Sequence, residues 1–159
     1  MASYESWSVA RGAEIIANEA KQDGATLPIL HALQRAFGYV PQEAVPMVAQ
    51  TLNLSRAEVH GVVSFYHDFR HEPAGRHVVK LCRAEACQAM GADDLHKHAQ
   101  DKLRVGWGET TNDGRVTLEP VFCLGLCACA PSAMVDGKVY GGLDSKKLDA
   151  LIERTVRAS

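Results

Sequence analysis

Four of the five cysteines in this chain fall into two tight pairs. Cys82 and Cys87 are separated by four residues, Cys123 and Cys127 by three, and 35 residues lie between the two pairs. Thiolates are soft ligands, and four of them carried by two loops can close around one inorganic centre. The ligand number, the donor type and Gly125 inside the second pair all suit a metal–sulfur site.

Three kinds of centre compete for these cysteines. A structural zinc site usually uses CxxC pairs, and the longer spacings found here fit it less well. A redox-active disulfide wants CxxC at a strand-to-helix turn, and the sequence contains no CxxC. A [2Fe–2S] cluster takes two thiolates per iron and tolerates varied spacing, so each pair can serve one iron. The cluster is favoured, and a zinc-stabilised interaction module is the alternative from another functional class.

The composition further limits the classes of protein to which this chain can belong. The chain has 159 residues, is 47% apolar and carries a formal net charge of −2, so it can bury a core and gives no electrostatic reason to expect nucleic acid. No apolar run approaches the roughly 18 residues of a membrane span. The first residues have neither a basic start nor an apolar h-region, so we expect a cytoplasmic protein without a secretory signal. In a reducing compartment, clustered cysteines are more often ligands or redox groups than structural disulfides.

Residues 1–75 read as a helical domain. Apolar residues recur at helical spacing over 8–22 and 28–37, with glycines 24 and 38 as stops. A third helix is expected over 41–52, where Pro46 fits only if the helix starts late or kinks. A capping-box pattern at 55–58 opens a fourth helix. Four such helices can pack into a small bundle.

Residues 76–159 alternate strands and helices. Strands are expected over 77–81 and 116–122, with a helix over 90–103 between them. Asp136-Gly137 between two short apolar runs predicts a hairpin, and a last helix starts at 144 or 145. The order predicts a small mixed sheet with two helices packed on it, and an α+β fold for the whole chain.

Each cysteine pair follows a predicted strand. Loops at the carboxyl ends of strands converge at one end of an α/β sheet, so pairs far apart in sequence can meet in space. Backbone N–H groups of these loops can then donate to the sulfurs, and the start of the helix after Cys87 adds partial positive charge.

The cysteine segments resemble one family in particular. Segment 82–87 (Cys-Arg-Ala-Glu-Ala-Cys), the 35-residue gap and segment 123–131 (Cys-Leu-Gly-Leu-Cys-Ala-Cys-Ala-Pro) are similar to the thioredoxin-like [2Fe–2S] ferredoxins. These include small subunits of respiratory complex I and of related hydrogenases and formate dehydrogenases. Segment 59–69 (Val-His-Gly-Val-Val-Ser-Phe-Tyr-His-Asp-Phe) resembles the helical signature that precedes the family's ferredoxin domain.

The resemblance implies a helical, partner-docking domain over 1–75 and a thioredoxin-like [2Fe–2S] domain over 76–159. It implies one cluster, with the four family ligands falling on Cys82, Cys87, Cys123 and Cys127. It also implies a larger partner subunit that binds FMN and NAD. The chain itself shows no nucleotide motif, since Gly106-Trp107-Gly108 does not continue as GxGxxG. We therefore expect an electron carrier without catalytic residues of its own.

Within the family, the residues of the cysteine segments most resemble those of the small subunits of NAD-dependent formate dehydrogenases. This resemblance implies a further partner, a molybdenum-containing catalytic subunit. The equivalent subunit of complex I, or of an NAD-linked hydrogenase, is the alternative.

Some further residues invite a functional interpretation. Cys129 is expected to be a small buried side chain near the cluster rather than an alternate ligand. His60, His67 and His71 fall on one face of a continued helix and are expected to be surface or packed histidines. The sequence does not decide whether Trp107 packs against the core or contacts a partner. The adjacent carboxylates at 93–94 are expected to favour a helix N-terminus rather than to act in catalysis.

Overall fold

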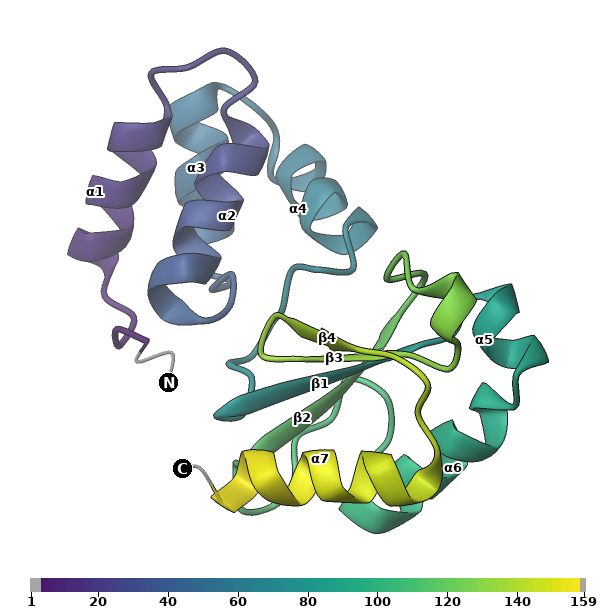
Figure 1. Ribbon diagram of the computed structural model, residues 1–159. Helices are drawn as coiled ribbons and strands as arrows, with labels where there is room; N and C mark the ends of the chain where they lie inside the picture. Colours follow the sequence, from purple (N-terminus) through teal and green to yellow (C-terminus); the bar gives the residue numbers. More distant parts are fainter. Residues whose placement is uncertain (1–3, 158–159) are drawn as a thin grey trace. The chain divides into compact units, whose positions relative to one another are not determined.

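Helices form the first part of the chain and a four-stranded sheet organises the second (Figure 1). The structure is a computed structural model and describes residues 4–157. Its contacts divide the chain into two units, one ending at Pro73 and the other running from Ala74 onward. No helix among the described residues is long and apolar enough to cross a membrane.

The helical unit contains α1 (Val9–Glu19), α2 (Thr26–Phe37), α3 (Ala44–Leu52) and α4 (Arg56–Phe65). All four predicted helices are present, and their ends differ by a few residues from the sequence prediction. α3 starts late, at Ala44, so Pro46 occupies its first turn, where a helix does not need the missing N–H.

Caps and stops explain where these helices begin and end. The Ser8 side chain accepts a hydrogen bond from the Arg11 N–H and caps α1. Ser55 and Glu58 form both halves of the predicted capping box at α4. α2 ends at Gly38, whose φ of 82° is a conformation that favours glycine.

The core of this unit comes from the faces that the helical spacing predicts. Phe37 lies at its centre, with its ring 5.0 Å from that of Trp7 in an edge-to-face contact. Fully buried aliphatic side chains from all four helices surround it: Ile16, Ile29, Leu33, Val48 and Val59.

The second unit contains β1 (His77–Cys82), α5 (Glu85–Ala89), α6 (Ala92–Leu103), β2 (Val116–Val121), β3 (Ala133–Val135), β4 (Lys138–Tyr140) and α7 (Ser145–Arg157). The strand order is β2-β1-β3-β4. β1 pairs parallel with β2 and antiparallel with β3, and β3 and β4 form the predicted hairpin. The predicted mixed sheet and the α+β fold are confirmed.

The structure adds one helix to the prediction for this unit. The helix expected over 90–103 is present as α6, and the short helix α5 precedes it; Gly91, with a φ of 84°, lies between the two. Cys87 lies inside α5, and the unit has three α-helices rather than two. The next helix start after Cys87 is that of α6, at Ala92.

The sheet and two long helices share one core. Val79 and Leu81 of β1 and Leu118 of β2 are fully buried and pack with Leu95 of α6 and Leu148 of α7. α7 contacts both β1 and α6. This packing fixes the strands whose ends carry the cysteines.

Candidate metal–sulfur centre

Both cysteine loops begin at the same edge of the sheet. β1 and β2 run parallel, and Cys82 at the end of β1 lies opposite Val121 at the end of β2. The Arg83 N–H donates to the Val121 carbonyl at 2.8 Å and extends the pairing into the loops. The predicted convergence of the two loops follows from this register.

The first pair is buried. Cys82 is the last residue of β1, Cys87 lies in α5, and each is 2% exposed. Both side chains belong to one small buried cluster. Ser132, which directly precedes β3, adds a hydroxyl oxygen 3.6 Å from the Cys87 Sγ.

The second pair lies on the surface. The Sγ atoms of Cys123 and Cys127 are 3.6 Å apart, and both residues are exposed. Cys123 has a φ of 83°, which is uncommon for a residue other than glycine, and Gly125 follows with a φ of 76°. This tight turn brings the Gly125 N–H to 3.4 Å from the Cys123 Sγ, so it donates to that sulfur.

The thiols change one another's pKa values through hydrogen bonds and charge. Burial raises the pKa of Cys82, but hydrogen bonds from the Ala84 N–H, the Cys87 thiol, the Cys123 N–H and Ser132 outweigh it and hold that pKa below its ordinary value. The pKa of Cys127 is raised, first by its hydrogen bond with Cys123 and by the charge there, and further by Cys87 and Cys82. These contributions link the pKa of Cys127 to Cys123, Cys87 and Cys82.

One side of the cysteine site is shielded from water, and the other side is exposed to solvent. Cys82, Cys87 and Ala92 form a small buried cluster, against which Val121 and Leu124 pack. On the open side, Phe122 is 72% exposed beside Cys123. Such a site shields the first pair of sulfurs from water and leaves the second pair at the surface.

The donor set suits a [2Fe–2S] cluster. That cluster takes two thiolates at each of two irons and is tuned by hydrogen bonds to its sulfurs, and the site offers two cysteine pairs with a backbone N–H donor, that of Gly125, to the Cys123 sulfur. Within residues 4–157, no three His, Cys, Asp or Glu side chains are arranged to hold a single metal ion.

Cys129 does not lie where the sequence predicts. It is exposed at the end of a short 3-10 helix (Cys127–Cys129) rather than buried. The Gly142 N–H donates to its carbonyl at 2.5 Å. The tight turn of the 3-10 helix turns this side chain to solvent, so the expectation of a buried packing residue is wrong.

Sequence reasoning missed His96. It is buried in α6, and its Nε2–H donates to the Cys82 carbonyl, with the two atoms 3.0 Å apart. Burial lowers the pKa of this imidazole below its ordinary value, against smaller opposing effects of the Cys82 carbonyl and Asp93. No local pattern points to His96, because its partner lies 14 residues away in another element.

Trp107 packs against the core of the second unit. Its ring meets the His96 ring edge-to-face, with the ring centres 5.3 Å apart. The Arg83 guanidinium lies 5.2 Å from the centre of the Trp107 ring, in cation–π geometry. Among the described residues, the buried Nε of Arg83 has no hydrogen-bond partner.

The other residues that the sequence singled out lie outside the two cysteine segments in the sequence. His60, His67 and His71 are exposed, and because α4 ends at Phe65 they do not share one helical face. Asp93 and Asp94 occupy the first turn of α6, as predicted.

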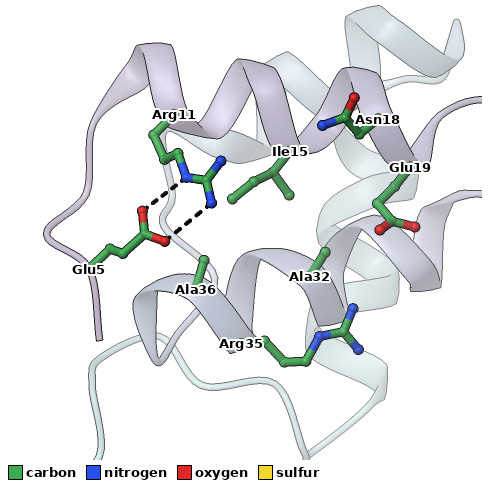
Figure 2. Close-up of a pocket in the computed structure, with 8 residues that line it drawn as sticks. All are labelled: Glu5, Arg11, Ile15, Asn18, Glu19, Ala32, Arg35 and Ala36. Carbon is green, nitrogen blue, oxygen red and sulfur yellow. Dashed lines mark hydrogen bonds and ion pairs between the residues drawn. The ribbon is translucent and has the colours of Figure 1, made fainter. Parts of the chain in front are cut away.

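An open pocket of about 340 Å³ lies in the helical unit, between α1 and α2. Figure 2 shows an ion pair between Glu5 and Arg11 (2.9 Å) at one side of it, and Glu19 and Arg35 farther along. No cysteine lines this pocket, so it has no part in the metal–sulfur centre.

Comparison with known proteins assigns the family. A sequence model described as thioredoxin-like [2Fe-2S] ferredoxin matches residues 12–156, and the chain belongs to this family. This confirms the resemblance drawn from the cysteine segments.

The relatives include subunits of two kinds of oxidoreductase. The chain is 35% identical over 132 residues to a subunit of the NADH-quinone oxidoreductase of Pseudomonas aeruginosa, covering 83% of this chain and 80% of that protein. It is 37% identical over 123 residues to the HndA subunit of the NADP-reducing hydrogenase of Solidesulfovibrio fructosivorans, covering 77% of this chain and 72% of that one.

Among solved structures, the chain is similar to part of an NAD+-reducing [NiFe]-hydrogenase in the H2-reduced state. The TM-score is 0.66 at 28% identity, and the match covers 82% of this chain and 22% of the hydrogenase chain.

Proposed function

We propose that this chain is an electron-transfer subunit that carries one [2Fe–2S] cluster beside the FMN- and NAD-binding subunit of an NAD(P)-linked oxidoreductase. The observation that supports the proposal most is the meeting of two cysteine pairs at the ends of two parallel strands, in a chain that belongs to the thioredoxin-like [2Fe-2S] ferredoxin family.

The proposed ligands are Cys82, Cys87, Cys123 and Cys127. When bound, the cluster would hold one electron at a time. The chain's own residues hold the sulfurs in place: strand pairing fixes Cys82, helix α5 fixes Cys87, and the turn at Gly125 fixes the second pair. The buried side limits access of water, and the open side at Cys123 and Cys127 leaves a short route for electrons to a partner.

A flavin-bearing partner follows from electron counting. Reduction of NAD takes a hydride, which carries two electrons, whereas one [2Fe–2S] cluster takes one, and a flavin is the usual group that converts between them. The two relatives from Pseudomonas and Solidesulfovibrio are subunits of NADH- and NADP-linked enzymes, which supports this part of the proposal. No catalytic residue is assigned to this chain.

For the parent complex, the sequence prediction of an NAD-dependent formate dehydrogenase with a molybdenum-containing subunit stays a prediction. The relatives belong to NADH-quinone oxidoreductase and to hydrogenases, and they favour the alternatives. Purification of the native complex, followed by assays with formate, hydrogen and quinone, separates the three. The cytoplasmic location likewise stays a prediction.

The helical unit is proposed as the docking element, as the resemblance implies. At the end of α4, Phe65 is 74% exposed and stacks edge-to-face with Tyr66, which is 44% exposed. Large exposed aromatic side chains of this kind are common at protein interfaces.

The functional test uses NADH. The purified chain alone should not oxidise NADH or formate, and its visible absorbance should stay unchanged when NADH is added. After addition of the flavin subunit, NADH should bleach the cluster absorbance. Turnover of NADH with a dye by the flavin-free chain alone would contradict the carrier assignment.

A further inference from the structure

Ser132 reaches the cysteine site through the sheet topology. β3 runs antiparallel to β1 with Ala133 opposite Leu81, and this register brings the preceding residue beside Cys82. The Cys82 N–H donates to the Ser132 carbonyl at 3.0 Å. Ser132 is 2% exposed, so its hydroxyl faces the interior.

The partners of this buried hydroxyl are sulfur atoms. Its oxygen lies 3.6 Å from the Cys87 Sγ, and the hydroxyl is also among the groups that lower the pKa of the Cys82 thiol. A hydroxyl can donate or accept, but a thiolate that ligates a metal has no proton and can only accept. With both cysteines as ligands, the Ser132 O–H must be the donor.

We propose that the Ser132 hydroxyl raises the reduction potential of the cluster by donating its hydrogen bond to the sulfur of Cys87, beside Cys82. The proposal rests on the proposed function, because it takes these two cysteines as ligands. Reduction adds one electron and therefore negative charge, and a donor stabilises the more negative form. The site is buried here, so water does not substitute for a lost hydroxyl.

The test is a redox titration of Ser132→Ala in the full-length protein, with mediators, followed by visible absorbance and electron paramagnetic resonance. At the midpoint potential of the wild type, the ratio of reduced to oxidised cluster should fall about tenfold, which is about 59 mV for a one-electron couple. The potential responds to the hydrogen bond itself, whereas a merely structural role would change stability or cluster content.

Thr117→Val is the matched control. Thr117 is also 2% exposed, lies in the same sheet near the start of β2, and its hydroxyl accepts from the Gly75 N–H at 2.7 Å. Loss of this hydroxyl removes its hydrogen bonds with the Gly75 N–H and the Thr110 hydroxyl, at the end of β2 opposite to the one that leads to Cys123. It should lower stability and leave the potential unchanged.

The pair Ser132→Thr and Ser132→Val tests the hydroxyl at constant shape. Thr should keep a potential near that of the wild type, and Val should match Ala. An unchanged potential in loaded Ala and Val variants overturns the proposal. Failure of Ala and Val to take up a cluster also overturns it, because the side chain would then serve assembly instead of the potential. A wild-type protein without a [2Fe–2S] spectrum would instead overturn the proposed function.

Discussion

The imidazole Nε2 of His96 lies 3.0 Å from the carbonyl oxygen of Cys82, so a buried side chain of α6 holds the peptide at the end of β1. Neighbouring backbone groups are fixed from other elements. The Cys82 N–H donates to Ser132, the Arg83 N–H to Val121, and the Gln88 side chain donates to the Arg83 carbonyl. The backbone of the first proposed ligand is therefore held in place by hydrogen bonds to residues of other elements.

His96→Leu should destabilise the protein by about 1–3 kcal/mol, because it leaves the buried Cys82 carbonyl without its donor. Urea denaturation followed by circular dichroism measures this change. His60→Leu is the control, since His60 is exposed on α4 and its removal should change stability little. Equal stability losses in the two variants would contradict the stabilising contribution assigned to the His96 hydrogen bond.

Replacement of any proposed ligand should remove the cluster. Cys82→Ala, Cys87→Ala, Cys123→Ala and Cys127→Ala should each abolish or grossly weaken the [2Fe–2S] spectrum, because each iron needs its two thiolates. Cys129→Ala should leave the spectrum intact, since Cys129 is exposed and outside the two pairs. A retained cluster in Cys127→Ala together with its loss in Cys129→Ala would reassign the fourth ligand.

Cluster assembly and binding of the flavin subunit should depend on different units of the chain. Residues 74–159 contain all four proposed ligands and a core of their own, so this fragment should assemble the cluster. Without the helical unit it should bind the flavin subunit much more weakly than the full chain. A pull-down with the purified flavin subunit measures this binding, and full-strength capture of the fragment would contradict the docking role.

The sequence predicted those features that local patterns determine. The capping box at Ser55, the hairpin at Asp136-Gly137 and the glycine stop at Gly38 are all local signals, and the structure confirms them. The convergence of the cysteine loops was also predictable, because parallel strands place their carboxyl ends together.

The missed residues depend on contacts between distant segments. Ser132 approaches Cys87 across 45 positions of sequence, and only the antiparallel pairing of β3 with β1 brings them together. His96 reaches Cys82 because α6 packs on the sheet. Cys129 was expected to be buried because free cysteines often are, but a short 3-10 helix carries no periodic signal that reveals its exposed side.

One pH dependence follows from the contact between α6 and α7. Asp149 accepts from the His98 Nε2 at 2.8 Å and forms an ion pair with the Lys102 Nζ at 3.1 Å. Burial raises the Asp149 pKa, but these two partners outweigh it and hold the pKa below its ordinary value. A carboxyl with a lowered folded-state pKa stabilises the protein above its unfolded-state pKa, and this stabilisation is lost as the pH falls through the folded-state pKa.

Asp149→Asn should therefore cost about 0.2–1 kcal/mol at pH 7, the usual range for partly exposed pairs. The difference from wild type should shrink as the pH falls through roughly 4 and below. Urea titrations at pH 7 and at acid pH give both values. A difference that stays constant over this range would contradict the assigned ionic contribution.

A reductive titration of the purified full-length chain tests the central assignment most directly. Dithionite is added in steps under anaerobic conditions, the visible absorbance is recorded, and iron and zinc are determined on the same sample. A [2Fe–2S] carrier predicts a brown protein with about two irons per chain that bleaches after one electron per cluster. A colourless protein with stoichiometric zinc, unchanged by dithionite, would contradict it and support the zinc-stabilised interaction module instead.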